Sequence, residues 1–293
     1  MDRAVIDGIE ALAALEQTGT VGEAATRLRL TQSAVSKRLA ALQRQVGSPI
    51  VAPDGRRVRI TAEGAALLER ARPLLAGLRD LCSPMGEVGP TRLSLALADS
   101  IAASWGPAVV ARALAEVPGL TLELHAHRSV LALERVRLGR YHLVLATGPA
   151  PPDLLHVPVV DEPLVELHGP VPGGPLITIE PTSATWRAVE GRLRRRHPEL
   201  FARELVPVES FGAALQMVRA GFGDGLLPLG LVQQAGLAPT RALTVSREVC
   251  LAGRKTIAGM PAFGRLAEAL ARHAASWFVA FDLHWAARPP KDR

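Results

Sequence analysis

One face of a short predicted helix carries side chains suited to an anionic partner. In the stretch LTQSAVSKRLAALQRQVG, residues 30–47, hydrophobic residues recur every three or four positions, which predicts a helix with one buried stripe. We expect that stripe to comprise Val35, Leu39, Leu42 and Val46. The polar face offers Thr31, Gln32, Ser33, Ser36, Lys37 and Arg38. The stretch contains no acidic residue, so these hydrogen-bonding and cationic groups favour a phosphate-bearing partner.

A basic segment surrounds this helix. Residues 27–59 contain eight Lys and Arg residues against one acid, Asp54, so the segment carries +7 while the whole chain carries +6. Within it, PDGRRVRIT predicts a hairpin that turns at Asp54 and Gly55, with Arg56, Arg57 and Arg59 as its cations. A polar helix face alone is usually only solvated, but its combination with a basic hairpin is typical of DNA-binding proteins.

Helix signals explain how these side chains would be positioned. A first helix is predicted through Ile6 to Leu15, and a second begins at Thr20, where Glu23 can complete a capping box. Gly47 ends the third helix. The sequence therefore predicts three short helices followed by the hairpin.

A longer helix is predicted to follow Thr61, which can cap it. Its repeat of three and four residues suits packing against a partner helix, although Pro73 interrupts the repeat and leaves a plain amphipathic helix as the alternative. The repeat comprises Leu68, Ala71, Leu75, Leu78 and Cys82. The stretch SPMGEVGP, residues 83–90, is rich in Pro and Gly and predicts a hinge.

Beyond residue 90, strands alternate with helices. The expected series is strand 92–98, helix 101–116, strand 120–126, helix 130–138 and strand 142–146. A second series follows, with strands near 175–180, 204–208 and 224–229 and helices at 186–196, 211–220 and 262–277. Such alternation predicts parallel sheets in two similar α/β lobes with a cleft between them.

Length and composition indicate a globular protein of two domains. The chain has 293 residues, of which 48% are hydrophobic, 21% charged and only 4% aromatic. Two distant cysteines, Cys82 and Cys250, predict no disulfide framework and no zinc site, and Cys250 is expected to be a buried structural thiol. The N-terminus lacks the pattern of a signal peptide and no stretch reaches the length of a membrane span. We therefore expect a location in the reducing cytoplasm and no membrane partner.

The quoted residues resemble the LysR-type transcriptional regulators over nearly the whole chain. GEAATRLRLTQSAVSKRLAALQRQVGSPI resembles that family's winged helix-turn-helix, and RRVRITAEG resembles its wing and linker helix. Further on, LSLALADSIAASWGPAVVARALAEVPGLTLEL and MVRAGFGDGLLPLGLV resemble segments of its effector domain. The chain departs from the family where Ile50, Val51, Ala52 and Pro53 follow the third helix, because an arginine common at that point is missing.

The resemblance implies an α/β fold class with three parts. Residues 1–61 would form an N-terminal winged helix-turn-helix of the all-α type that binds DNA, and residues 62–90 a linker helix for dimerisation and a hinge. Residues 91–293 would form a two-lobed α/β effector domain of the periplasmic-binding-protein type. A homodimer, paired again into a homotetramer, would bind a pseudo-palindromic operator in double-stranded DNA.

On this basis, the polar helix would lie in the major groove. Gln32 can pair with adenine, Ser33 and Ser36 are short enough for close approach, and Lys37 and Arg38 would read guanine or hold phosphates. Thr31 would cap the helix. Arg56, Arg57 and Arg59 of the wing would add phosphate or minor-groove contacts.

The candidate effector site is the cleft between the lobes, where strand ends meet helix N-termini. Asp99 and Ser100 follow the first strand, Thr182 and Ser183 open the helix after PLITIE, and Ser129 opens another helix. The alternative is that these residues only cap helices. Asp99 would disfavour a carboxylate against it, so its position is compatible with a neutral or cationic group on a small-molecule effector.

Catalytic interpretations have little support in the sequence. GFGDG lacks the full spacing of a dinucleotide fingerprint, and phosphate-loop, zinc-protease and serine-hydrolase motifs are missing. His125 and His127 would share one side of a strand but lack a third ligand, which is typical of surface residues. We therefore expect no enzyme, no cofactor and no metal. The alternatives to an effector-responsive regulator are an effector-independent DNA binder and a two-lobed small-molecule binding protein without a DNA role.

Overall fold

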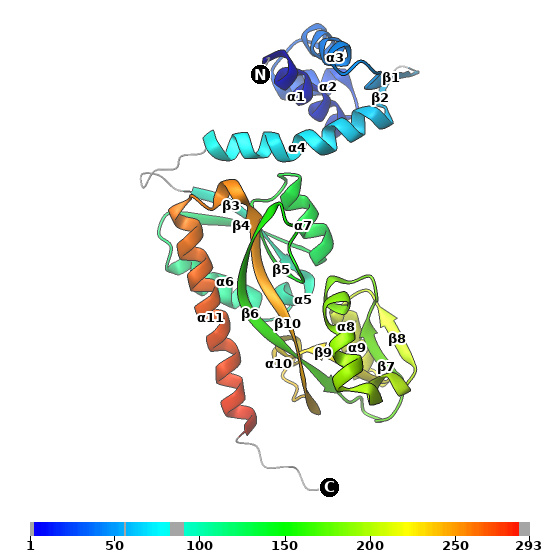
Figure 1. Ribbon diagram of the computed structural model, residues 1–293, viewed down its shortest axis with the longest axis vertical. Coiled ribbons are helices and arrows are strands. Elements are labelled where there is room, and N and C mark those ends of the chain that lie inside the picture. Colours follow the sequence, from blue (N-terminus) through cyan, green and yellow to red (C-terminus); the bar gives the residue numbers. More distant parts are fainter. Residues whose placement is uncertain (1–2, 56, 83–90, 287–293) are drawn as a thin grey trace. The chain divides into compact units, whose positions relative to one another are not determined.

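The computed structural model describes residues 3–55, 57–82 and 91–286 (Figure 1). Its contacts divide the chain into two compact units, Met1–Leu78 and Arg79–Arg293. The predicted hinge at residues 83–90 lies outside the described residues. Among the helices that the structure describes, none is long and apolar enough to cross a membrane.

The first unit is a helical cluster followed by a hairpin and a long helix. Its core joins buried residues of three helices, among them Leu12, Val35 and Leu39, with Ile50 and Leu68. The elements are α1 (Arg3–Thr18), α2 (Val21–Leu28), α3 (Gln32–Val46), β1 (Val51–Asp54), β2 (Arg57–Ile60) and α4 (Ala62–Cys82). This order agrees with the expected winged helix-turn-helix and linker helix.

Local capping explains where α2 begins and ends. The Glu23 N–H donates to Thr20 Oγ1 at 3.2 Å, which confirms Thr20 as the N-cap. The Glu23 carboxylate accepts the Thr20 hydroxyl at 2.8 Å, whereas a full capping box would have it accept the Thr20 backbone N–H. Arg29 ends α2 in the left-handed region with φ of 55°, a conformation that costs a non-glycine residue free energy. The tight turn between α2 and α3 depends on this residue.

The predicted stripe of α3 is correct for three of its four residues. Val35, Leu39 and Leu42 are buried, but Val46 is 39% exposed. Val46 lies in the last turn of α3, past the end of the core, and Gly47 then ends the helix with φ of 77°. The periodicity is therefore correct, whereas the core covers a shorter length of the helix than the pattern predicts.

The hairpin and α4 are anchored to each other at Thr61. In the antiparallel pairing Asp54 opposes Arg57, so the chain turns at Gly55. The Thr61 hydroxyl accepts the Gly64 N–H at 3.1 Å and donates to the Pro49 carbonyl at 2.7 Å. A Cβ at position 64 would lie 2.1 Å from the Ile50 carbonyl oxygen, so only glycine lets α4 start this close to the hairpin.

The predicted long helix forms in full, from Ala62 to Cys82, and its backbone stays helical through Pro73. Leu68 joins the core of the first unit, whereas Leu74 is 71% and Leu78 39% exposed. The side chain of Cys82 lies outside the described residues. This helix therefore presents large hydrophobic side chains beyond the core.

The second unit consists of two α/β lobes. The first contains β3 (Thr91–Ala98), α5 (Asp99–Ala102), α6 (Gly106–Ala115), β4 (Leu120–His127), α7 (Ser129–Arg137), β5 (Leu143–Thr147) and the closing helix α11 (Pro261–Ala286). The second contains β7 (Leu176–Ile179), α8 (Ala184–Arg196), a 3-10 turn η1 (Pro198–Ala202), β8 (Leu205–Val208), α9 (Phe211–Arg219), β9 (Asp224–Pro228) and α10 (Leu229–Gln234).

Two long strands connect the lobes, and neither belongs to the series of strands expected from the sequence, although residues 247–252 around Cys250 were expected to be strand-like. The two strands are β6 (Leu154–Leu167) and β10 (Arg241–Arg254), which pair antiparallel with each other along their length (Figure 1). The strand order is β4-β3-β5-β10-β6-β9-β7-β8. The pairs of β3 with β4 and β5, and of β7 with β8 and β9, are parallel as predicted. The sheet is therefore mixed, not parallel throughout.

The predicted helix over residues 101–116 is divided in two. Gly106 and Pro107 open α6, because proline suits the first turn of a helix and cannot continue an earlier one. A Cβ at Gly106 would lie 2.6 Å from the Ile101 carbonyl oxygen, so the break also packs tightly. The short α5 that precedes it holds Asp99 and Ser100 at the carboxyl end of β3.

Candidate functional site

The polar face of α3 is exposed at its N-terminal end. Thr31 caps the helix by accepting the Ala34 N–H at 3.1 Å. Gln32, Ser33, Ser36 and Lys37 are all exposed. Because Val35 and Leu39 bury the opposite face, these donors and the cation point away from the core together.

Arg38 differs from its neighbours on this face. Its guanidinium lies 3.1 Å from the Asp7 carboxylate of α1, and both side chains are about 30% exposed. A half-exposed pair of this kind contributes about 1 kcal/mol or less. Arg38 therefore links α3 to α1 and is less available to a partner than Lys37. This role of Asp7 was not predicted from the sequence.

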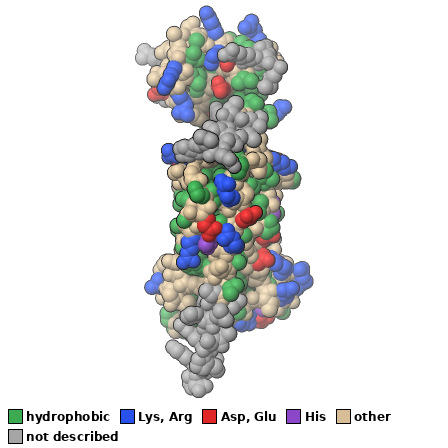
Figure 2. Space-filling model, turned by 90° about the vertical axis from the view of Figure 1, so that its left-hand side faces the viewer, with side chains coloured by type: hydrophobic (Ala, Val, Ile, Leu, Met, Phe, Trp, Pro, Cys, Tyr) green, Lys and Arg blue, Asp and Glu red, His purple; other side chains and the backbone are tan. Residues whose placement is uncertain are grey.

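The hairpin adds one described cation to this surface. Arg59 on β2 is exposed, whereas the side chains of Arg56 and Arg57 lie outside the described residues. Figure 2 shows Lys and Arg side chains on several parts of the first unit, with few acidic side chains between them. The exposed face of α3 and the hairpin together form a basic, hydrogen-bonding surface.

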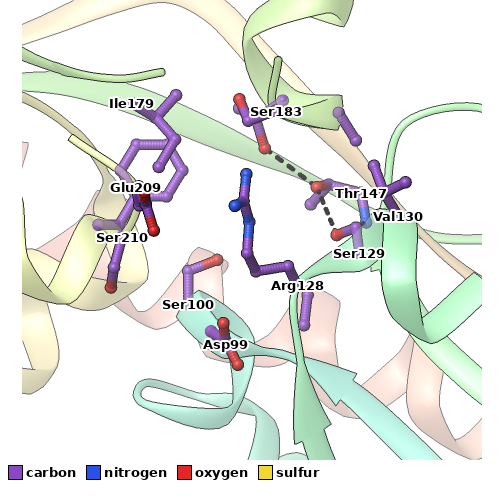
Figure 3. Close-up of a pocket in the computed structure, with 14 residues that line it drawn as sticks. Asp99, Ser100, Arg128, Ser129, Val130, Thr147, Ile179, Ser183, Glu209 and Ser210 are labelled. Carbon is purple, nitrogen blue, oxygen red and sulfur yellow. Dashed lines mark hydrogen bonds between the residues drawn. The ribbon is translucent and has the colours of Figure 1, made fainter. Parts of the chain in front are cut away.

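A pocket lies between the two lobes of the second unit (Figure 3). The space between its lining residues is about 450 Å³ when the solvent at its mouth is included, so the pocket is an open cleft and not a closed cavity. Its walls come from the ends of β3, β5 and β7 and from the starts of α7, α8 and α9. Four predicted residues, Asp99, Ser100, Ser129 and Ser183, line it. Thr182 is exposed and does not line it, because the turn presents the next residue to the pocket.

The serines play different structural roles. Ser183 caps α8 by accepting the Trp186 N–H at 3.0 Å, whereas Ser129 and Ser100 do not cap a helix through their side chains. Ser129 instead lies 3.1 Å from the Thr147 hydroxyl, which lies 3.0 Å from that of Thr185. These three hydroxyls form a chain from one lobe to the other, so helix capping alone does not account for the predicted site.

A buried ion pair supports the pocket from beneath. Arg247 of β10 binds the Glu162 carboxylate of β6 through Nε at 3.0 Å and Nη2 at 2.6 Å, and both residues are almost fully buried. Arg247 Nη1 also donates to Ser100 at 2.9 Å, and its guanidinium lies 5.3 Å from the Phe211 ring centroid. Ser100 and Phe211 line the pocket, so Arg247 fixes pocket residues from both lobes.

The pocket contains charges of both signs. Arg128 extends its side chain into the pocket (Figure 3). It forms an ion pair with Glu180, which follows β7. Asp99 and Glu209 contribute carboxylates from opposite lobes. Glu209 and Ser210 follow β8 and also line the pocket, and neither was predicted. Ser210 caps α9 by accepting the Gly212 N–H at 3.1 Å, so the signal that identified Ser183, a serine at a helix start, could have found it.

Trp186 and His127 lie close in sequence to the strand ends that line the pocket, but they do not line it. Trp186 is 4% exposed and belongs to the hydrophobic core. His127 stacks with His125 on Tyr141, at centroid distances of 5.7 Å and 4.3 Å from that ring. Burial, followed by the charge of Arg135, lowers the pKa of His127 below its usual value. Both histidines are partly exposed on β4, as expected of surface residues, and each packs against the Tyr141 ring.

A cluster of acids and bases lies at the far end of the second lobe. Asp224 is almost fully buried and binds Arg203 at 2.6 Å. Burial raises the pKa of Asp224, but hydrogen bonds from the N–H groups of Gly169 and Gly173 and from Arg203 outweigh it, so the pKa lies below its ordinary value of 3.8. This carboxylate organises the loops around GFGDG, which supports a structural role for that motif.

Comparison with known families assigns both units. The family description "Bacterial regulatory helix-turn-helix protein, lysR family" matches residues 6–65. The description "LysR substrate binding domain" matches residues 87–275, which is more than half of the chain. The two matches lie in the order expected from the sequence.

Relatives and solved structures agree with this assignment. A probable hydrogen peroxide-inducible genes activator of Mycobacterium avium is 30% identical, over 81% of this chain and 86% of its own. A probable nitrogen assimilation transcriptional activator of Synechococcus elongatus is 27% identical, over 85% of this chain and 86% of its own. A full-length OxyR variant from Pseudomonas aeruginosa has a similar fold, with a TM-score of 0.66 at 19% identity over 90% and 94% of the chains. The structure of full-length CbnR in complex with its target DNA has a TM-score of 0.61 at 19% identity, and the match covers 91% of this chain and 98% of CbnR.

Proposed function

The chain belongs to the LysR family of DNA-binding transcriptional regulators, and we propose that it recognises one operator sequence and responds to a small molecule bound between its lobes. The observation that carries the DNA part is the exposed polar face of α3, with Lys37 and without an acid, beside the basic hairpin. The observation that carries the ligand part is the pocket whose polar walls come from both lobes.

For DNA recognition, we propose that α3 enters the major groove with its first two turns. Gln32 would pair with adenine, Ser33 and Ser36 would approach bases or phosphates, and Lys37 would read guanine or bind phosphate. Thr31 would hold the helix start in shape. Arg56, Arg57 and Arg59 would bind the backbone or minor groove, and Arg38 would contribute less because Asp7 already holds it.

We further propose that α4 forms the dimer interface. Leu74 and Leu78 are large hydrophobic side chains left exposed on this helix, and burial of such side chains against a second copy would favour association. Two α3 helices related by a two-fold axis require a pseudo-palindromic operator. A homotetramer built from two dimers, and a cytoplasmic location where the DNA lies, complete the proposal.

The pocket supports an effector with a cationic or neutral polar group. Asp99 and Glu209 would attract a cation, and Ser100, Ser129 and Ser183 would donate or accept hydrogen bonds. Arg128 is already paired with Glu180, which leaves it less able to bind a ligand carboxylate. A ligand that contacts both lobes biases their arrangement by its differential affinity, and by no more than that. The role is regulatory and not catalytic.

The experiment that tests this function compares binding of the purified protein to its own upstream DNA with binding to a scrambled duplex of equal length, across a salt series. We expect a preference of about 10³-fold or more for the upstream DNA, the range of specific regulators. Equal and salt-sensitive binding to both duplexes would indicate a non-specific binder. Failure to bind either duplex would favour a small-molecule binding protein without a DNA role.

A further inference from the structure

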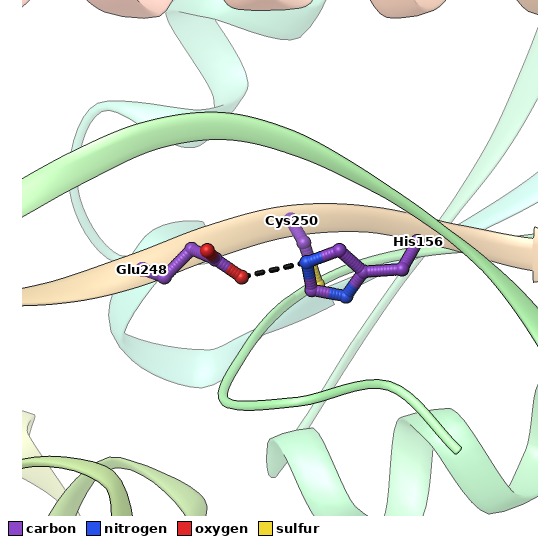
Figure 4. Close-up of side chains that lie close together, drawn as sticks. All are labelled: His156, Glu248 and Cys250. Atoms are coloured by element: carbon purple, nitrogen blue, oxygen red, sulfur yellow. Dashed lines mark ion pairs between the residues drawn. The ribbon is translucent and has the colours of Figure 1, made fainter. Parts of the chain in front are cut away.

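Three side chains with different ligand atoms meet on the strands that connect the lobes (Figure 4). They are His156 of β6 and Glu248 and Cys250 of β10. His156 Nε2 lies 2.7 Å from a Glu248 carboxylate oxygen, and all three ligand atoms lie within 4.8 Å of one another. Neither the DNA-binding surface nor the inter-lobe pocket uses these residues.

The pairing of the strands explains why the three meet. Glu248 and Cys250 are two positions apart on β10, so they project from the same face of the sheet. His156 pairs with Ala252, which shares that face, and a register shift between Val249 and Cys250 inserts one extra residue in β6. Such a bulge changes the direction of side chains locally and is common beside functional sites.

We propose that His156, Glu248 and Cys250 bind one divalent cation of the zinc type. Thiolate, imidazole and carboxylate are the three ligand types of protein zinc sites, with bonds of about 2.0–2.3 Å. A tetrahedral ion at that distance holds its ligand atoms about 3.3–3.6 Å apart, so separations of up to 4.8 Å would have to contract by about 1 Å at most. The fourth position would hold water.

The surroundings of the cluster favour a cation. Asp161 is the direct antiparallel partner of Glu248, and like charges at such positions repel each other unless a cation lies between or beside them. The Cys250 thiol donates weakly to the Gly148 carbonyl, at 3.7 Å. The acceptor in this contact is a neutral oxygen. A metal ion that bound the sulfur would therefore replace only the thiol proton, and no other cation would have to leave.

A second cluster of potential metal ligands lies in the same unit, but its carboxylates are already paired with cations. Glu166, His168 and Asp224 also bring their ligand atoms within 4.8 Å. There, however, Arg203 binds both carboxylates at 2.9 Å and 2.6 Å, and Arg241 lies 3.3 Å from Glu166. Guanidinium groups already neutralise these acids and would repel a metal ion, so this cluster serves as an internal control.

An ion would reach the site from the solvent side. The side chains of His156 and Glu248 are 33% and 45% exposed, whereas Cys250 is buried beneath them. Binding would separate the His156–Glu248 pair, form the bond from metal to sulfur, and release the thiol proton to water. Because β6 and β10 both carry ligands, the bound ion would also tie together the two strands that link the lobes.

The test is titration of the untagged, reduced, full-length protein with Co²⁺, which reports a thiolate ligand by a sulfur-to-cobalt charge-transfer band, followed by competition with Zn²⁺. We expect one ion per chain, displacement by Zn²⁺, and loss of the band in Cys250→Ser. In His156→Ala, binding should weaken at least tenfold, because even residues that only orient metal ligands change affinity by about 10–100-fold. Cys82→Ser and His168→Ala should bind like the natural protein.

Three results would overturn the proposal. The first is a cobalt complex without the charge-transfer band, and the second is a band that Cys82→Ser removes and Cys250→Ser retains. Circular dichroism and duplex DNA binding of each variant would show that it is folded, so a folded Cys250→Ser protein that still binds Zn²⁺ with unchanged affinity also contradicts it. DNA binding in the absence of metal tests the proposed function separately.

Discussion

At the scale of single residues, Gln32 and Arg59 are both exposed in the first unit but are expected to act differently on DNA. Gln32→Ala should remove discrimination at particular base pairs, at a cost of about 1–3 kcal/mol on the preferred operator and little on random DNA. Arg59→Ala should weaken binding to both duplexes alike. It should also reduce the slope of log affinity against log salt concentration by about one, because one phosphate contact is lost. Binding isotherms on both duplexes, each at several salt concentrations, measure the two effects.

Equal losses on operator and random DNA for Gln32→Ala would remove this residue from the base-reading set. Gln45→Ala, an exposed amide near the other end of α3, provides the matched control, because its position lies outside the first two turns. It should leave both affinities unchanged.

Asp224 gives a residue-scale prediction about acid stability. Its pKa in the folded protein lies below 3.8, so its contribution to stability is complete above that value and is lost as the pH falls through the folded pKa. Asp224→Asn should cost about 1–3 kcal/mol at neutral pH, because it removes one of the two buried carboxylates that bind Arg203 and weakens the hydrogen bonds from Gly169 and Gly173. The difference from the natural protein should shrink from about pH 5 to about pH 3. Urea denaturation at each pH measures it.

A constant difference across that pH range would show that Asp224 contributes through packing and not through its charge. Asp153→Asn is a suitable comparison, since Asp153 is a half-exposed partner of Arg137. Its effect on the free energy of unfolding should stay below about 1 kcal/mol.

At the scale of elements, sequence patterns predicted the helices and parallel strands well but did not predict the full length of the two longest strands. β6 contains Pro158 and Pro163, and its burial changes along its length because it leaves one lobe and enters the other. The second half of β10 is continuously buried, whereas its first half alternates. A strand that serves two cores has no single periodicity, so a search for period two did not find either one in full.

The residues of the pocket divide in the same way, into those that local sequence signals predicted and those that come from the two long strands. Ser100, Ser129 and Ser183 were found because strand ends and helix starts can be recognised locally, and the sheet then brings them together. Arg247 and Glu162 were missed because they come from the long strands, where a charged pair resembles surface residues until the pairing is known. Local signals predicted the edge of the pocket but not its base.

The exposed face of α4 makes a prediction about association. Leu74→Glu should convert the proposed dimer to monomer, because a charge in a hydrophobic helix interface is buried without a partner. Glu69→Lys is the matched control: it is exposed on the opposite side of the same helix, by its position in the helical period, and should leave the mass unchanged. Sedimentation equilibrium gives the mass of each variant.

A Leu74→Glu protein that stays dimeric would place the interface elsewhere. If both variants are monomeric and the natural protein is too, α4 is a plain amphipathic helix, as the interruption at Pro73 allows. Loss of association should also weaken operator binding, because the two half-sites are then no longer bound together.

At the scale of the whole second unit, the Arg247–Glu162 pair joins both lobes beneath the pocket. Arg247→Met should destabilise the protein by about 3–5 kcal/mol, because it leaves the Glu162 carboxylate buried without a cation. Adding Glu162→Gln should recover part of that loss, since the neutral amide can still accept the Gly230 N–H. Urea denaturation of the single and double variants measures the difference. A double variant no more stable than the single one would show that packing, not charge, dominates at this position.

The position of β10 in the sheet also has a consequence for synthesis of the chain. β10 lies between β5 and β6, yet it is made last of all the strands that the structure describes. Until residue 254 has left the ribosome, β5 and β6 each have an open edge where β10 will pair, and neither lobe has its complete sheet. A nascent chain or a product truncated before residue 241 would expose these edges, so it should aggregate or require a chaperone, whereas the first unit, complete by residue 78, can already be folded.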